Sequence, residues 1–115
     1  RDPAQIQYTS GTTGHPKGAL LHHMGLVTNA SFVAARAAID KTVVLSPMPL
    51  FHTAGAVLSS LGCVTTGSTY LLPLLFDPEL ILSAIETERA QVFFGVPTMQ
   101  ISLLEHPKRA SFDLS

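Results

Sequence analysis

The stretch that decides this fold reads Thr9-Ser10-Gly11-Thr12-Thr13-Gly14-His15-Pro16-Lys17-Gly18. Its glycines can adopt positive φ angles and carry no Cβ, so successive backbone N–H groups can turn toward one bound anion. The hydroxyl side chains add hydrogen-bond donors around the same point. Lys17 adds a mobile positive charge, and Pro16 stiffens the backbone before it. We therefore predict that this stretch is a phosphate-binding loop.

Two other interpretations fit the loop less well. A Walker A loop requires Gly before its lysine and Ser or Thr after it, but Pro16 and Gly18 stand at those positions. A flexible hairpin loop between two strands would explain an isolated pair of glycines. Here nine residues keep a fixed register, namely 9–14, Pro16, Lys17 and Gly18. At about 6% usage per residue, chance would give this run with a frequency on the order of 10⁻¹¹ per position.

Outward from the loop, short β-type runs alternate with longer helical patterns. The ranges 5–9, 18–21, 42–46, 68–72 and 91–94 are expected to be strands. Helices are expected from 22 or 23 to 39, over 55–66, over 78–88, and from 97 to a point before Pro107. Strands separated by helices pair in parallel through crossover connections. The predicted fold class is therefore α/β, with a partial, mostly parallel sheet and crossover helices.

Two helix boundaries have a clear chemical basis. Asp77 can accept a hydrogen bond from a free backbone N–H of the first turn, and Pro78 suits the first helical position. Glu79 favours the positive end of the helix dipole. Gly67 is expected to end the apolar helix over 55–66, because glycine adopts the left-handed conformation at helix ends.

The composition indicates that this sequence is a segment of a larger protein. Only 13% of the 115 residues are charged and 46% are hydrophobic, whereas an average soluble domain carries about 25% charge. We expect residues 1–115 to form a partial domain, incomplete at both ends, whose apolar faces are covered by other segments. On its own such a chain is expected to bind hydrophobic dyes or to aggregate.

Charge and cysteine content exclude several classes of function. The net charge of −1 offers no basic surface, so nucleic acid is not an expected partner. The single Cys63 cannot form an internal disulfide. No run reaches the roughly 18 apolar residues of a transmembrane segment. No HExxH or CxxC pattern occurs, so no metal site is predicted on the protein itself.

Together with two later motifs, the loop resembles the AMP-binding signature of adenylate-forming enzymes, a group of acyl-CoA synthetases, luciferases and adenylation domains of peptide synthetases. The second motif is Pro49-Leu50-Phe51-His52-Thr53-Ala54-Gly55, and the third is Gly95-Val96-Pro97-Thr98. Two further segments have sequences most similar to those of medium- and long-chain fatty acyl-CoA synthetases. They are Lys17-Gly18-Ala19-Leu20-Leu21-His22-His23 and Glu105-His106-Pro107. The resemblance places the chain in the large N-terminal domain of such an enzyme.

The resemblance implies an ATP-dependent acid–thiol ligase. A fatty acid carboxylate attacks the α-phosphorus of ATP, giving an acyl-adenylate and pyrophosphate, and coenzyme A then displaces AMP to form the thioester. The expected ligands are ATP with its bound Mg²⁺, the fatty acid and coenzyme A. The nucleotide-binding residues implied are Thr9, Ser10, Gly11, Thr12, Thr13, Gly14 and Lys17, and Lys17 is also assigned a catalytic role.

The second and third motifs carry the residues assigned to the acid. They are His52, which is also assigned a catalytic role, with Gly55, Val96, Pro97 and Thr98. A histidine that only caps the following helix is the alternative for His52, and an ordinary apolar helix face is the alternative for Val96.

Other functions stay open at this point. An adenylation domain that activates aryl or amino acids is one alternative, and a non-catalytic nucleotide-binding module is another. The parent protein is expected to be an enzyme and the isolated segment to be inactive. The default location is the cytoplasm, with the mitochondrial matrix as the alternative if a transit peptide has been removed.

Overall fold

A parallel sheet organises most of the chain in a computed structural model that describes residues 2–11 and 14–115. The elements are β1 (Pro3–Thr9), β2 (Lys17–His22), α1 (His23–Arg36), β3 (Val43–Leu45), the π-helix η1 (Ala54–Leu61), α2 (Gly62–Thr66), β4 (Thr69–Leu71), α3 (Pro78–Glu88), β5 (Val92–Phe93), α4 (Pro97–Leu104) and the 3-10 turn η2 (Arg109–Ser111). Within the sheet β3 is central, with β4 and β5 parallel to it on either side. The predicted α/β class and the parallel pairing are confirmed.

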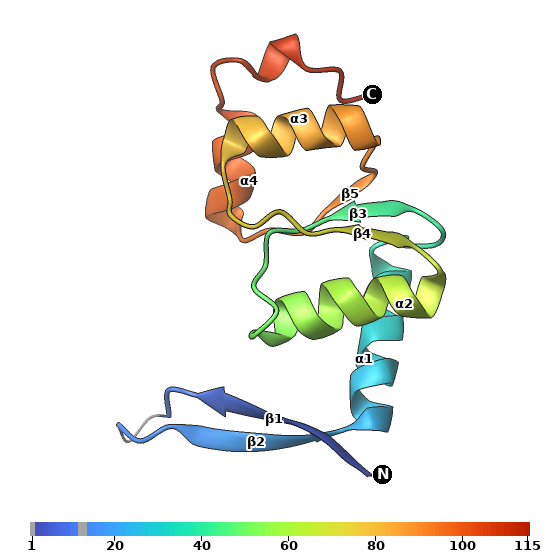
Figure 1. The fold of residues 1–115 in the computed structure, drawn as a ribbon, viewed down its shortest axis with the longest axis vertical. Helices are drawn as coiled ribbons and strands as arrows, with labels where there is room; N and C mark the ends of the chain where they lie inside the picture. Colours follow the sequence, from blue (N-terminus) through green and yellow to red (C-terminus); the bar gives the residue numbers. More distant parts are fainter. Residues whose placement is uncertain (1, 12–13) are drawn as a thin grey trace.

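Helices cover both faces of this sheet. Successive strand residues point to opposite faces, so Val44 joins one core cluster and Leu45 joins another. The first cluster contains Ala34, Ile39 and Cys63 and lies under α1 and α2. The second contains Ile81, Leu82 and Leu103 and lies under α3 and α4. Figure 1 shows the resulting order of layers, with the sheet between α2 and α3.

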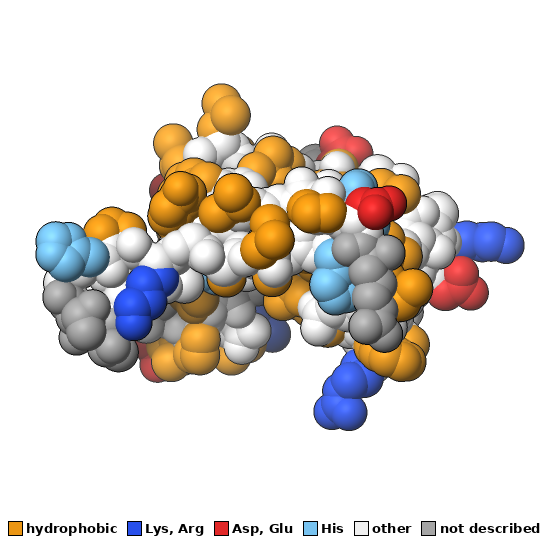
Figure 2. Space-filling view, turned by 90° about the horizontal axis from the view of Figure 1, so that it is seen from below, with side chains coloured by type: hydrophobic (Ala, Val, Ile, Leu, Met, Phe, Trp, Pro, Cys, Tyr) orange, Lys and Arg blue, Asp and Glu red, His pale blue; other side chains and the backbone are white. Residues whose placement is uncertain are grey.

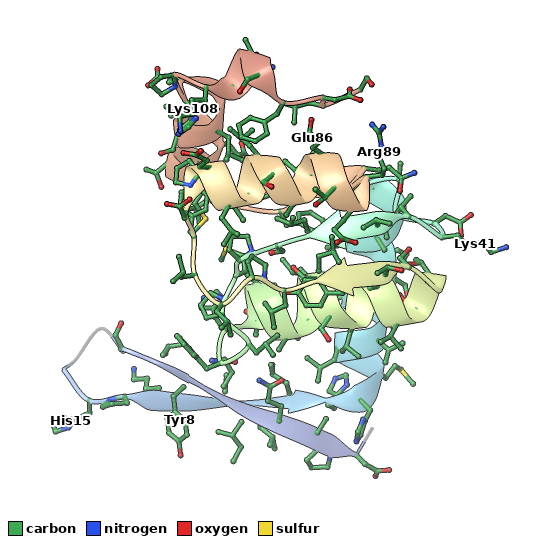
Figure 3. The ribbon with its side chains drawn as sticks, turned by 45° about the horizontal axis from the view of Figure 1, so that its top comes forward. Tyr8, His15, Lys41, Glu86, Arg89 and Lys108 are labelled. Carbon is green, nitrogen blue, oxygen red and sulfur yellow. The ribbon has the colours of Figure 1, made fainter. Side chains whose placement is uncertain are left out.

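The strands β1 and β2 form an antiparallel hairpin at one end of the long axis (Figure 1). Pairing runs from Pro3 with His22 to Thr9 with Lys17. None of the hairpin residues that the structure describes is buried. Figure 2, seen from the hairpin's end of the molecule, shows hydrophobic side chains spread over this face. In Figure 3, Tyr8 projects from the hairpin away from the parallel sheet.

Helix α1 ends three residues earlier than predicted, at Arg36 rather than at residue 39. Ala38 adopts a left-handed conformation with φ 53°. The Ile39 N–H donates to the Ala34 carbonyl at 2.9 Å, and the Ala38 N–H donates to the Ala35 carbonyl at 3.3 Å. This is a Schellman ending with alanine at the position usually taken by glycine. The turn buries Ile39 against Ala34 in the first core cluster.

The helix predicted over 55–66 begins at Ala54 and has two parts, the π-helix η1 and the α-helix α2. In η1, the buried Ser59 hydroxyl donates to the Ala54 carbonyl at 3.1 Å, five residues back along the chain. The predicted helix is therefore confirmed, and residues 54–61 of it take the wider π-helical form. Gly67 ends α2 at φ 65°, as predicted.

The predicted caps of the later helices are largely confirmed. Asp77 Oδ1 accepts from the Leu80 N–H at 2.8 Å, and α3 spans Pro78–Glu88. Pro97 opens α4, which ends before Pro107 as predicted. The paired strands are shorter than the predicted ranges 42–46, 68–72 and 91–94.

Ion pairs hold the C-terminal segment against α3. Lys108 Nζ lies 2.8 Å from Glu79 Oε1, and Arg89 Nη1 lies 2.9 Å from Asp113 Oδ2. Hydrogen bonds from Ser115, and then the Arg89 guanidinium, lower the pKa of Asp113 to about 2. Figure 3 shows Glu86 and Arg89 on the side of α3 that faces this segment. No helix in the described part of the chain is long and apolar enough to cross a membrane.

Candidate functional site

The predicted phosphate loop is the connection of the β1–β2 hairpin. Thr9 ends β1, and its cross-strand partner Lys17 begins β2. Gly11 has φ 67° and Gly14 has φ 83°, values that side chains other than glycine rarely adopt. A Cβ on Gly11 would also overlap the His15 carbonyl oxygen. The hairpin interpretation and the phosphate-loop interpretation are therefore compatible, because one loop has both features.

The side chains assigned to nucleotide binding are accessible where they are described. Thr9, Ser10, Gly14 and Lys17 are exposed, and Gly11 is half-buried. The Thr9 hydroxyl makes a long hydrogen bond of 3.5 Å to the Lys17 carbonyl. Thr12 and Thr13 lie outside the residues that the structure describes.

The second motif forms a turn between β3 and η1. The His52 N–H donates to the Pro49 carbonyl at 3.0 Å, and the His52 carbonyl accepts from the Ala56 N–H at 3.0 Å. His52 Nδ1 accepts from the Ala54 N–H at 3.1 Å. The ring thus accepts from the first backbone N–H of η1, a local contact compatible with the simpler interpretation, although the N-cap residue of η1 is Thr53. Because Nδ1 is occupied as an acceptor, the neutral ring carries its proton on Nε2, and the exposed side chain can present that nitrogen to a ligand.

Position 55 requires glycine for a structural reason that the sequence did not indicate. A Cβ on this buried glycine would overlap the carbonyl oxygens of Met48 and Pro49. The close approach that requires glycine is therefore to the protein's own backbone. A contact between Gly55 and the acid remains a prediction.

A cavity of about 310 Å³ joins the second and third motifs. Its lining consists of Met48, Ala54, Leu58, Ser59, Phe94, Gly95, Val96 and Pro97. Val96 and Pro97 were assigned to acid binding from the sequence, and the structure places both in the wall. His52, Gly55 and Thr98 are not among the lining residues. Thr98 is exposed on α4, where its carbonyl accepts from the Ser102 hydroxyl at 2.8 Å.

Six of the lining residues were not assigned to a ligand from the sequence. Ala54 and Gly95 lie within the second and third motifs, whereas Met48, Leu58, Ser59 and Phe94 lie outside them. Phe94 immediately follows β5, and Met48 lies three residues beyond the end of β3. In open α/β sheets, ligands bind outside the carboxyl ends of the strands. That rule, applied to the predicted strands 42–46 and 91–94, indicates the region of the chain in which both residues lie.

The hairpin tip lies on the same side of the molecule as the carboxyl ends of β3, β4 and β5 (Figure 1). Figure 3 shows His15 at this tip. The phosphate loop, the second motif and the cavity therefore occur toward one edge of the structure. Gln7 connects the hairpin to this edge, because its Nε2 donates to the Phe51 carbonyl at 3.2 Å.

A second cavity, of about 420 Å³, lies between the hairpin base, α1 and η1. Its lining is Leu20, Leu21, His22, Gly25, Leu26, Asn29, Thr53, Val57 and Leu58. It is larger than the first, but it contains none of the residues assigned to nucleotide or acid. We therefore place the candidate site at the smaller cavity, which the motifs line.

Metal-binding side chains do not gather in this site. The residues that the structure describes contain no group of three or more His, Cys, Asp or Glu side chains that could hold a metal ion.

The fold and the site define the chain as an α/β protein in which a glycine-rich hairpin loop and an apolar cavity lie toward the same edge of the structure. A family model described as AMP-binding enzyme matches residues 1–115, and the chain belongs to this family.

Named relatives agree with this assignment. The chain is 38% identical over 120 residues to the human mitochondrial medium-chain acyl-CoA ligase ACSF2, covering 99% of this chain and 20% of that protein. Among solved structures, the inhibitor-bound N-terminal domain of FACL13 from Mycobacterium tuberculosis matches with a TM-score of 0.84 and 32% identity, covering 98% of this chain and 28% of that one. ATP-bound MatB from Rhodopseudomonas palustris matches with a TM-score of 0.75 and 39% identity, covering 90% and 20%. The chain thus spans about a fifth of the length of the curated relatives.

Proposed function

We propose that the protein containing this chain is an AMP-forming fatty acid–coenzyme A ligase. It would activate the fatty acid with ATP, releasing pyrophosphate, and would then transfer the acyl group from the adenylate to the thiol of coenzyme A. The observation that carries the proposal is the position of the glycine-rich hairpin loop and the motif-lined apolar cavity toward the same edge of the structure. The ATP-bound relative supports the use of ATP.

In the first step, the loop would hold the β- and γ-phosphates of ATP. The segment Thr9 to Gly14 supplies backbone N–H groups and hydroxyls, and Lys17 supplies a full positive charge. Negative charge grows on the departing pyrophosphate as the carboxylate attacks. Fixed donors and a cation aimed at that charge lower the barrier without reorganisation of solvent. Mg²⁺ bound to ATP would partly neutralise the same phosphates.

The acid would lie in the apolar cavity with its carboxylate toward the loop. Val96 and Pro97 line this cavity beside Met48 and Leu58, and these side chains suit an alkyl chain. His52 would offer its Nε2–H at the turn before η1 to the carboxylate, since Nδ1 is already occupied. Gly55 would keep that turn close to Met48 and Pro49. Thr98, in the first turn of α4, would also bind the acid. No residue of this chain is assigned to coenzyme A.

We place the enzyme in the cytoplasm, with the mitochondrial matrix as the alternative that the mitochondrial relative favours. We expect the 115-residue chain to be inactive alone, because its relatives are about five times longer.

The test is ATP–pyrophosphate exchange by the full-length protein with a panel of fatty acids, aryl acids and amino acids. The proposal predicts exchange that depends on a fatty acid, followed by thioester formation when coenzyme A is added. Exchange with aryl or amino acids alone would replace the acid class. Nucleotide binding without exchange for any acid would favour a non-catalytic module.

A further inference from the structure

We propose that Gln7 is a positioning residue that holds the phosphate loop in register with the acid-binding turn. The inference rests on the proposed function, since it concerns the alignment of ATP with the acid. It begins from the placement of the hairpin, whose described residues contribute nothing to the buried core. The two buried core clusters therefore contain no residue of the hairpin that would fix the loop relative to His52.

Gln7 bridges the two segments through its side-chain amide. Its Nε2 donates to the Phe51 carbonyl at 3.2 Å, across 44 positions of sequence. Phe51 immediately precedes His52, and Gln7 stands two positions before Thr9, where β1 ends. Among the described residues, this is the one hydrogen bond from the hairpin to the turn between Pro49 and His52.

The amide of Gln7 is also fixed at its other end. Gln5 Nε2 donates to Gln7 Oε1 at 3.0 Å, and this bond orients the Gln7 amide with its nitrogen toward Phe51. Gln5 and Gln7 occupy the same face of β1, because strand side chains alternate. On the opposite face Ile6 and Tyr8 are 57% and 67% exposed, whereas Gln7 is half-buried.

The acceptor is equally well placed for this task. A backbone carbonyl in a hydrogen-bonded turn cannot rotate freely, and the His52 N–H to Pro49 carbonyl bond closes the turn that contains Phe51. A movement of the hairpin would therefore change the Gln7–Phe51 contact. Reactions between two bound groups depend steeply on their relative placement. Gln7 would thus act on the adenylation step while touching neither substrate.

The experiment compares Gln7→Leu with Gln5→Leu in the full-length enzyme. Gln7→Leu removes the donor to Phe51. Gln5→Leu makes the same chemical change on the same strand face, but it removes only the bond that orients the Gln7 amide and keeps the donor itself. We expect Gln7→Leu to lower kcat for ATP–pyrophosphate exchange about three- to tenfold, the range typical of one lost hydrogen bond. The Kd for ATP, measured by calorimetry without acid, is expected to stay unchanged.

A second variant, Gln7→Asn, tests the position of the amide, because it keeps the amide group but shortens the side chain by one methylene group. It should lower kcat as Gln7→Leu does, and Gln5→Leu should have the smaller effect. Equal kcat for all variants, equal losses for Gln5→Leu and Gln7→Leu, or a loss confined to the Kd for ATP would overturn the positioning role. Absence of exchange in the unmodified enzyme would instead overturn the proposed function, and this inference with it.

Discussion

The β1–β2 hairpin differs from the rest of the fold in exposure and in sequence pattern. We call the rest the layered unit, which is the parallel sheet of β3, β4 and β5 with its helices η1 and α1 to α4. The hairpin holds the run with the most specific sequence pattern, yet none of its described residues is buried. The layered unit holds the residues with the least exposure, such as Val44, Leu45 and Ile81, all at 0–1%. Chemical specificity and folding energy are thus assigned to different stretches of one short chain.

This division has a physical reason. Under the proposed function, the loop must leave its N–H groups and its lysine available to phosphate, so these groups are not used in packing the core. The layered unit supplies that core and positions the second and third motifs at the carboxyl ends of its strands. The comparison predicts that substitutions in the hairpin change catalysis and that substitutions in the layers change stability.

The sharpest test on the hairpin side is Lys17→Ala in the full-length enzyme. Loss of a charge aimed at the departing pyrophosphate should slow ATP–pyrophosphate exchange by about a hundredfold or more. The free energy of unfolding should not change, since Lys17 is exposed. Lys41→Ala is the matched control, because it removes the same charge from a loop on the opposite side of the molecule (Figure 3). An unchanged exchange rate for Lys17→Ala would remove this residue from the site.

On the other side of the comparison, Ile81→Ala should have the largest effect on stability. Ile81 is fully buried between α3 and the sheet, and truncation of such a side chain costs about 3 kcal/mol. Hydrogen exchange of the full-length protein should accelerate in peptides from α3, β5 and α4, and stay the same in hairpin peptides. Leu80→Ala, at a neighbouring side chain that is 48% exposed, is the control. Equal acceleration in the hairpin would mean that the two regions open together.

Gly55→Ala lies where the two regions meet, and it should affect both properties. The added Cβ would overlap two backbone carbonyl oxygens, so the turn before η1 must move, at a cost of about 2 kcal/mol. Melting temperature and exchange activity should both fall. Gly62→Ala is the matched control in the adjoining helix α2, because its Cβ would make only ordinary contact with Ala34, at 3.9 Å. Activity loss without loss of stability would point to a direct contact between Gly55 and the acid.

The smallest effect is expected from Ala38→Gly, and its sign is stabilising. Ala38 is held at φ 53°, and glycine relieves that strain while adding freedom to the unfolded chain, for a net gain of about 0.5 kcal/mol. Ala35→Gly within the same helix should instead cost about 1 kcal/mol. Chemical denaturation followed by circular dichroism would measure both. A destabilised Ala38→Gly protein would contradict the Schellman ending.

Much of the layered unit could be predicted because its signals are local. The Asp77-Pro78 cap, the glycine at 67 and the β-branched run around Val44 each act through neighbouring residues, and the structure confirms all three. The end of α1 was placed too late because alanine, not glycine, takes the left-handed position at Ala38. No propensity rule selects alanine there, whereas burial of Ile39 does.

The candidate site could be predicted only in part. The motif pattern identified Val96 and Pro97, which line the cavity, and the loop residues, which are accessible where described. It did not identify Ser59, whose place in the cavity wall depends on the π-helical form of η1. Nor did it indicate Gln7, because a contact across 44 positions leaves no trace in local spacing. These features arise from tertiary geometry.

The π-helix at Ala54–Leu61 also bears on how this segment tolerates changes in length. The N-terminal end of η1 holds His52 at the edge of the sheet. Helix α2, which continues η1, holds Cys63 in the core beside Ala34. One residue removed from a regular α-helix would rotate everything beyond it by about 100°. A wide helical turn can absorb a single deletion by reverting to the α-helical spacing. Related chains one residue shorter here could therefore keep both ends in place.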